Sequence, residues 1–200
     1  MVKQHLLLGL FWVIYCVLHS LLANLVFKNS VRKWMGSKYY MYRILYTVFA
    51  FVTLVLVIYY GLTIPTSLVF DSSIVTDIIG MLIGSAGLIL MLICIKKYFI
   101  SLSGLKSLIR EEYSNELMIT GVHKYVRHPL YTGTFAFLWG LFLIFPNWNL
   151  FVSNVIITAY TLIGIKLEEE KLIKEFGEQY RVYRQQVPML FPLLRLKRGL

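Results

Sequence analysis

The chain has 200 residues, of which 58% are hydrophobic and only 15% charged, and its mean hydropathy is +0.69. Soluble domains carry about 25% charged residues, so this composition excludes an ordinary soluble protein and predicts an all-α integral membrane protein. A net charge of +10 would suggest nucleic-acid binding in a soluble chain, but membrane proteins concentrate Lys and Arg in cytoplasmic loops. We therefore expect a lipid bilayer and no nucleic acid among the partners.

The first apolar run, residues 6–27, predicts a retained transmembrane helix. It is longer than the apolar core of a signal peptide, about 7–15 residues, and no small-residue cleavage site follows it. His19 lies inside this run, where a histidine is either a functional residue or a hydrogen-bond partner of a neighbouring helix. Cys16 and Cys94 both lie in apolar runs without metal-type spacing, so we expect no metal site.

Three further segments complete the N-terminal half. Residues 28–43 are basic and aromatic without an acid, which predicts a cytoplasmic loop with an aromatic belt. Residues 44–62 predict a second transmembrane helix, and residues 74–95 a third that ends at Lys96. The third run contains Gly80 and Gly84 in GxxxG spacing, which we interpret as helix packing alone. The polar stretch from there to residue 124 predicts a surface segment.

Two apolar runs, residues 130–145 and 150–165, follow with a tight turn between them. Each contains 16 residues, about 24 Å of helix against a hydrocarbon core of about 30 Å. They predict a helical hairpin that either extends beyond its apolar part or thins the bilayer. The predicted fold is thus about five transmembrane helices followed by a cytoplasmic C-terminal amphipathic helix.

The distribution of charge predicts the orientation of these helices. With the N-terminus outside, Lys3 is the only one of the 20 Lys and Arg residues left outside, while Asp71 and Asp77 lie at the outer face. This asymmetry follows the positive-inside rule and accounts for the net charge. We therefore expect the N-terminus outside and the C-terminus in the cytoplasm, in the plasma membrane of a prokaryote.

The thirteen residues 121–133, immediately before the hairpin, combine basic and aromatic side chains with a helix breaker. Pro129 fixes its own φ and biases His128 toward an extended conformation, so the backbone should break beside Arg127 and His128. Irregular backbone at membrane depth is tolerated where it is buried in protein or lines a wet cavity, which favours a binding site. The alternative is a basic, aromatic interfacial anchor.

The helix that follows the hairpin contains a carboxylate that is a candidate partner for residues 121–133. At about 100° per residue, Glu169 falls within an apolar stripe, whereas Glu168 and Glu170 fall on either side of it. The apolar members of the stripe are Leu162, Ile165, Ile173 and Phe176. A carboxylate in this position is costly to bury unless it is paired, so we expect a nearby cation, either Arg127 or a cationic ligand. Gly177 is a candidate end for the helix.

Together these residues suit a zwitterionic, aromatic, sulfonium-bearing ligand. Arg127 and His128 are donors for an anion, Tyr125 and Tyr131 offer aromatic faces, and Glu169 is a carboxylate. The sequence contains no P-loop, dinucleotide fingerprint or Ser/His/Asp arrangement. Haem binding is disfavoured, because only His19 is placed within a predicted helix.

These residues carry a family resemblance. Two ordered blocks flank the hairpin: the first is Arg127-His128-Pro129-Leu130-Tyr131-Thr132-Gly133, and the second comprises Glu168-Glu169, Phe176-Gly177, Tyr180, Tyr183 and Val187-Pro188. Over about residues 80–192 this pattern resembles the isoprenylcysteine carboxyl methyltransferases and the related phospholipid N-methyltransferases. His19-Ser20 and Tyr42-Arg43 in the N-terminal helices resemble, more loosely, the methanethiol S-methyltransferases.

The resemblance implies a membrane methyltransferase that uses S-adenosyl-L-methionine. Residues 1–79 would form N-terminal helices with a basic cytoplasmic loop, and residues 80–200 the methyltransferase core. The resemblance places Arg127, Glu168 and Glu169 at the reacting centre. It places these residues on the cofactor side: Gly121, His123, Tyr125, His128 and Tyr131.

The acceptor implied by the resemblance is a lipophilic or membrane-borne small molecule, with an isoprenylcysteine-type carboxylate as the first expectation. A small thiol and a phospholipid amine are the alternatives. A non-catalytic membrane scaffold or sensor is the rival from another class. A nicotinamide-dependent sterol reductase, whose C-terminal region is similar, is disfavoured because those chains are longer and have about twice as many spans.

Overall fold

The computed structural model of the protein describes residues 1–102 and 117–192, and for Arg43 and residues 97–102 the backbone alone. The helices of these parts are α1 (Val2–Ala23), α2 (Leu25–Met35), η1 (Gly36–Met41), α3 (Tyr42–Thr63), α4 (Ile74–Leu102), η3 (Gly121–Lys124), α5 (Pro129–Ile144), α6 (Trp148–Phe176) and α7 (Glu178–Gln186). Helices α1, α3, α4 and α6 are long and apolar enough to span a bilayer, and α5 is a shorter apolar helix. The chain is an all-α integral membrane protein, as its composition predicts.

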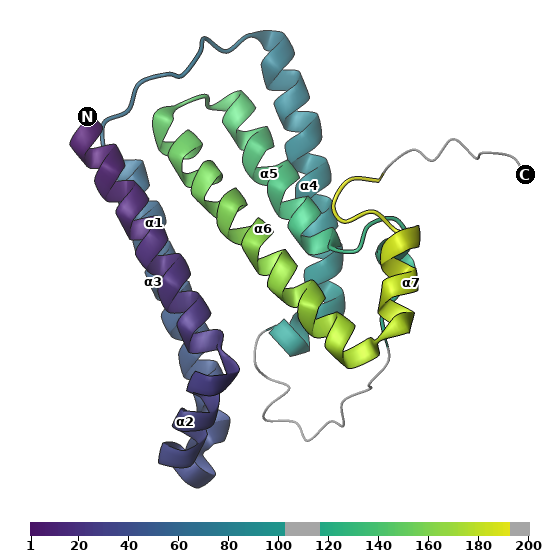
Figure 1. Ribbon diagram of the computed structural model, residues 1–200. Coiled ribbons are helices and arrows are strands. Elements are labelled where there is room, and N and C mark those ends of the chain that lie inside the picture. Colours follow the sequence, from purple (N-terminus) through teal and green to yellow (C-terminus); the bar gives the residue numbers. More distant parts are fainter. Residues whose placement is uncertain (103–116, 193–200) are drawn as a thin grey trace, which may run out of the picture.

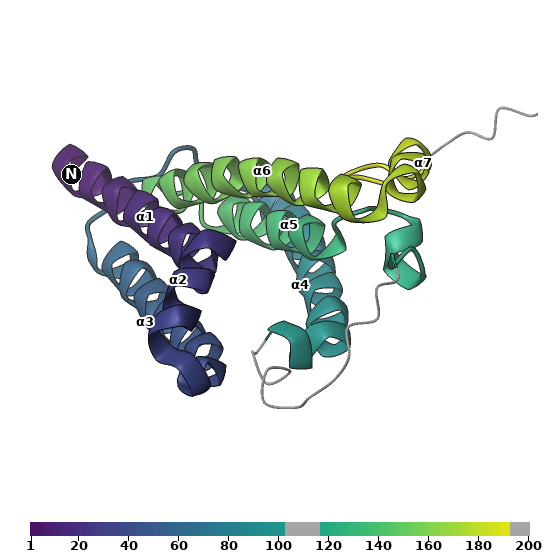
Figure 2. The same ribbon diagram turned by 60° about the horizontal axis from the view of Figure 1, so that its bottom comes forward.

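The five apolar helices alternate in direction along the molecule (Figure 1). Helices α1 and α3 form an antiparallel pair on one side, α4 and α5 form a second pair, and α6 lies between the two pairs (Figures 1 and 2). Helices α2 and η1 lie at the same end of the molecule as the end of α6. This arrangement gathers the segments expected at the cytoplasmic surface at one end.

Helix α6 is held against the α1–α3 pair by apolar packing and by interhelical hydrogen bonds. The apolar cluster comprises Leu8, Trp12, Val57 and Ile64, with Ile156 and Ile157 of α6 packed against it. The Trp12 indole N–H donates to the Ser153 hydroxyl over 2.8 Å. His19 of α1 lies 3.0 Å from the Tyr46 hydroxyl of α3, so its role as a partner between helices is confirmed.

Helices α4 and α5 approach closely because glycines face each other across their interface. A Cβ built on Gly140 would lie 2.5 Å from the backbone nitrogen of Gly84, and one built on Gly87 would lie 2.6 Å from the carbonyl oxygen of Gly133. Real Cβ atoms do not come this close to backbone, so these positions require glycine. The interpretation of Gly80 and Gly84 as packing residues is confirmed.

Helix boundaries differ from the sequence prediction in three places. Helix α1 ends before the apolar run does, because Asn24 is extended (ψ 140°) and its side chain accepts a hydrogen bond from the Val26 N–H, which starts a new helix. Residues 28–43 are largely helical, as α2 and η1, and not a loop. Helix α4 continues past Lys96, since lysine is a good helix former and a charge ends a membrane segment without ending a helix.

The predicted hairpin is present, and its second helix extends well beyond its apolar part. Helix α6 has 29 residues, about 44 Å, and ends where Gly177 adopts φ +57°. The chain then reverses into the nine-residue helix α7. Residues 187–190 return from α7 to the start of α5. The polar stretch expected after α4 lies mostly outside the described residues.

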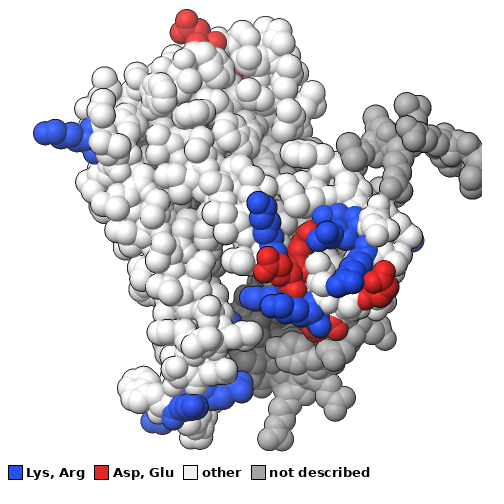
Figure 3. Space-filling view, in the orientation of Figure 1, with Lys and Arg blue, Asp and Glu red and all other residues white. Residues whose placement is uncertain are grey.

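Charged side chains separate toward the two ends of the molecule. Lys and Arg gather over α2, η1 and the α6–α7 corner in Figure 3. Asp71 and Asp77 lie at the other end, in the loop before α4 and in its first turn. The molecule therefore has the charge asymmetry that the topology prediction requires, and the assignment of the basic end to the cytoplasm is a prediction.

Candidate functional site

The backbone breaks beside Arg127 and His128, as Pro129 predicts. Pro129 occupies the first turn of α5, and His128 before it has φ −121° and ψ 66°, outside the helical region. The N–H groups of these residues consequently have no helical partner, and the C-terminal segment supplies one for each. Arg127 N–H donates to the Pro188 carbonyl over 2.9 Å, and His128 N–H donates to the Met189 carbonyl over 3.1 Å.

The Arg127 guanidinium joins three elements. Its Nε and NH2 groups lie 2.8 and 2.7 Å from Oε1 of Glu169 in α6, and its NH1 group donates to the carbonyl oxygens of Arg184 and Val187. The two ionic side chains are only 9% and 11% exposed. Four of the five N–H donors of Arg127 are therefore directed at protein acceptors. This side chain fixes α7 and the segment after it to α6.

Glu169 occupies the position that helical phase predicts. Glu169 is 8% exposed and lies about one helical turn after the fully buried Ile165, on the same face of α6. Glu168 and Glu170 are exposed. The predicted pairing of Glu169 with Arg127 is confirmed by the contacts above. The outer oxygen, Oε2, also lies 3.8 Å from the NH1 group of Arg184.

His128 lies between the two carboxylates. Its Nε2 is 3.2 Å from Oε1 of Glu169, and its Nδ1 is 3.8 Å from Oε2 of Glu168. The Tyr131 hydroxyl donates to that same Glu168 oxygen over 3.2 Å, and the Tyr131 and His128 rings stack with centroids 5.8 Å apart. Since the Glu168 side chain is 46% exposed and that of Glu169 is 11% exposed, Glu168 is the carboxylate that a ligand reaches more readily.

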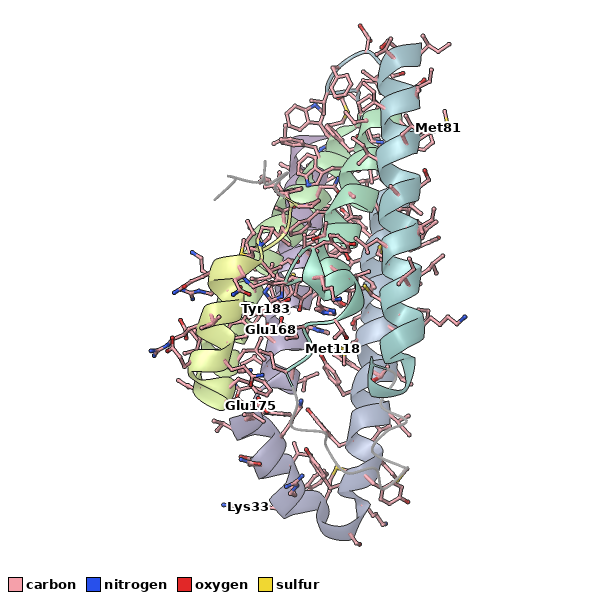
Figure 4. The ribbon with its side chains drawn as sticks, turned by 90° about the vertical axis from the view of Figure 1, so that its right-hand side faces the viewer. Lys33, Met81, Met118, Glu168, Glu175 and Tyr183 are labelled. Atoms are coloured by element: carbon pink, nitrogen blue, oxygen red, sulfur yellow. The ribbon has the colours of Figure 1, made fainter. Side chains whose placement is uncertain are left out.

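Residues 121–126, the first half of the thirteen-residue motif 121–133, contact α7 through the carbonyl of His123. Gly121 has φ +64° at the start of η3, and the carbonyl of His123 accepts a hydrogen bond from the Tyr183 hydroxyl over 2.7 Å. Tyr125 is 69% exposed. Figure 4 shows the labels of Glu168 and Tyr183 close together, beside α7. The structure thus brings Arg127, His128, Tyr131 and the two glutamates together. Gly121, His123 and Tyr125 lie earlier in the same segment.

For several residues of this cluster, no role was predicted from the sequence. Arg184 reaches Glu169 from α7, and the Thr132 hydroxyl donates to the Leu190 carbonyl over 2.6 Å, which closes the C-terminal segment onto α5. Tyr180, on α7, is buried beside the same carboxylates. The spacing of Tyr180 and Arg184, one helical turn apart, was the available signal that both face the cluster.

Comparison with known proteins places this cluster in a family. The sequence model of the phospholipid methyltransferase family matches residues 76–179, which include Arg127, His128, Tyr131 and both glutamates. The chain belongs to the phospholipid methyltransferase family. Within the described residues, no group of three or more His, Cys, Asp or Glu side chains is placed to hold a metal ion.

Two kinds of methyltransferase are among the curated relatives of this phospholipid methyltransferase family member. A methanethiol S-methyltransferase from Crocosphaera subtropica is 43% identical over 75 residues, covering 38% of this chain and 29% of the relative. A protein-S-isoprenylcysteine O-methyltransferase from Schizosaccharomyces pombe is 32% identical over 82 residues, covering 40% of this chain and 35% of the relative. The chain thus aligns with only about a third of these relatives' length. No solved structure matches the chain.

Proposed function

We propose that this protein is an S-adenosyl-L-methionine-dependent methyltransferase that works at the cytoplasmic surface of the membrane. The observation that carries the proposal is the buried cluster of Arg127, His128 and Glu169, which lies in the family-matched region and closes the C-terminal segment over the start of α5. An interfacial anchor would need neither this ion pair nor the backbone bonds to residues 188 and 189.

The residues present fit a zwitterionic sulfonium cofactor. Glu168 offers a partly exposed carboxylate for a cation, Tyr131 and His128 offer stacked rings, and the buried Tyr180 hydroxyl has no hydrogen-bond partner among the described residues. Gly121, His123 and Tyr125 would extend the cofactor side along η3. When bound, the cofactor supplies a methyl carbon that the sulfonium already activates.

Methyl transfer of this kind asks the protein mainly to align two reactants and to exclude water. We assign the exclusion of water to the segment that Arg127 fixes, because it covers the start of α5. With four N–H donors engaged, Arg127 is not free to bind an acceptor carboxylate bidentately in this conformation. Arg127 and Glu169 are therefore positioning residues, and Glu168 is the carboxylate proposed to touch the reactants.

For the acceptor, a small thiol is the first candidate. The relatives named methanethiol S-methyltransferase reach 43% identity, over 75 aligned residues. An isoprenylcysteine carboxylate is the second candidate, favoured by the relatives named protein-S-isoprenylcysteine O-methyltransferase. Residues 1–79, largely outside the matched region, would then serve the acceptor side, and residues 80–200 would form the methyltransferase core.

The test is methyl transfer by the purified protein in detergent with S-adenosylmethionine carrying a labelled methyl group. Methanethiol, N-acetyl-farnesylcysteine and phosphatidylethanolamine are offered separately, and labelled product is separated from donor. Methylation of the thiol is expected, and Glu168→Gln should lower it about 100-fold, while Glu170→Gln leaves it unchanged. Failure of the folded protein to bind S-adenosylmethionine or S-adenosylhomocysteine would overturn the proposal and favour a scaffold or sensor.

A further inference from the structure

Tyr180 of α7 is a buried side chain whose hydroxyl lacks a hydrogen-bond partner in residues 1–102 and 117–192. Only 1% of its surface is exposed. A buried hydroxyl without a partner costs free energy, and native proteins contain few such groups. The Asn149 and Asn154 amides each leave an oxygen unpaired, but their nitrogens still donate to backbone carbonyls. The hydroxyl is the only polar group of the Tyr180 side chain.

The surroundings of this hydroxyl are those of the candidate site. The Glu169 carboxylate lies close enough to act on it as a weak acceptor but outside the geometry of an ordinary hydrogen bond, and the charges of Arg127 and Glu168 also act on it. Burial raises the pKa of Tyr180, and the negative charge of Glu169 raises it further. The phenol therefore stays neutral at physiological pH and keeps its proton, which makes it a hydrogen-bond donor.

The hydroxyl is also held in place. Gly177, with φ +57°, turns the chain so that α7 packs back toward the motif, and Arg127 binds the Arg184 carbonyl one turn after Tyr180. The Tyr180 ring also contacts the Tyr183 ring, with centroids 5.9 Å apart. A donor fixed in this way loses little freedom when it binds a ligand, which is how binding sites present polar groups.

We propose that Tyr180 is a ligand-binding residue of this site, whose hydroxyl donates a hydrogen bond to bound S-adenosylmethionine or to its demethylated product. The inference rests on the proposed function, because it places the cofactor beside the Arg127–Glu169 pair. Tyr180 follows directly after the family-matched residues 76–179, so the family match does not assign it a role.

The experiment compares Tyr180→Phe with the unsubstituted protein in detergent. Calorimetric titration with S-adenosylhomocysteine gives the Kd, and the melting temperature is measured without ligand. Tyr180→Phe should weaken binding about tenfold, the effect of one hydrogen bond, because the ring stays and only the donor is lost. Without ligand its melting temperature should stay the same or rise, since an unpaired buried hydroxyl has been removed.

Tyr183→Phe is the matched control for the loss of a phenol hydroxyl that has a protein partner. It breaks the bond to the His123 carbonyl, so its melting temperature without ligand should fall. A Tyr180→Phe protein that melts lower and keeps the original Kd would overturn the inference alone, because the hydroxyl would then serve the fold. No binding by the unsubstituted protein would overturn the proposed function and this inference with it.

Discussion

At the scale of single residues, Glu169 shows how a charge is accommodated on an apolar helix face. Its Oε1 receives two N–H groups of Arg127 and lies 3.2 Å from His128, and its Oε2 has Arg184 nearby. A buried carboxylate is stable only when its charge is compensated and its oxygens are hydrogen-bonded. The same contacts bring α6, the motif and α7 together, so this one carboxylate ties the candidate site to the fold.

Removing the charge of Glu169 should therefore destabilise the protein. Glu169→Gln leaves Arg127 buried without an anion, which typically costs about 3 kcal/mol or more. Thermal unfolding in detergent measures the loss. Glu170→Gln is the matched control, because its side chain is exposed and should change the free energy of unfolding by less than about 0.5 kcal/mol. Equal stability of the two variants would contradict the burial of Glu169.

Arg127 and Glu169 should behave as one unit in turnover. Arg127→Lys loses the planar fork that meets one carboxylate and two carbonyls together, so the segment after α7 should shift and lower turnover about 100-fold. Glu169→Gln should have a similar effect, and the double variant should be little worse than either. Additive losses in the labelled-methyl assay would show that the two residues act separately.

The sequence predicts those features of the site that depend on neighbouring residues, and not those that depend on contacts between distant parts of the chain. The period of an α-helix is enough to place Glu169 inward and Glu168 outward, and the proline rule is enough to break the backbone at His128. Arg184 and Thr132 were not predicted, because their contacts depend on the direction in which the chain leaves Gly177. Gly177 frees that direction, and only the packed structure shows which one is taken.

At the scale of secondary-structure elements, the α4–α5 interface sets the position of the motif. The motif leads directly into α5, and glycines allow that helix to lie against α4 with backbone in contact. The GxxxG spacing of α4 was visible in the sequence, but its partner on α5, Gly140, follows from which helices meet. Helix ends were predicted less well, since membrane composition marks where the bilayer ends and not where the helix ends.

Two glycine substitutions in this interface should differ sharply. A Cβ on Gly140 would lie 2.5 Å from Gly84 backbone, so Gly140→Ala forces α4 and α5 apart and should cost about 1–3 kcal/mol. On Gly84, the nearest atom to an added Cβ is 3.7 Å away, an ordinary contact, so Gly84→Ala should be tolerated. Melting temperatures in detergent compare the two, and an equal loss would contradict the interface.

At the scale of the whole molecule, the distribution of basic side chains between the two ends of the membrane helices agrees with the alternating direction of those helices. Basic side chains gather in two groups, one over α2 and η1 and one over the α6–α7 corner, where the candidate site lies (Figure 3). Of the 20 Lys and Arg residues, Lys3 lies in the first turn of α1, at the opposite end. From the positive-inside rule we therefore predict that the candidate site lies on the cytoplasmic side.

This orientation predicts which of two exposed serines reaches the outside. Ser72 lies in the loop before α4 and Ser37 in η1, and both are exposed at opposite ends of the membrane helices. In intact cells, an impermeant thiol reagent should label Ser72→Cys and leave Ser37→Cys unlabelled until the membrane is opened. The native protein is the control, because Cys16 and Cys94 are buried and should not react. Labelling of Ser37→Cys alone would invert the topology, and a cytoplasmic cofactor could then no longer reach the cluster around Glu169.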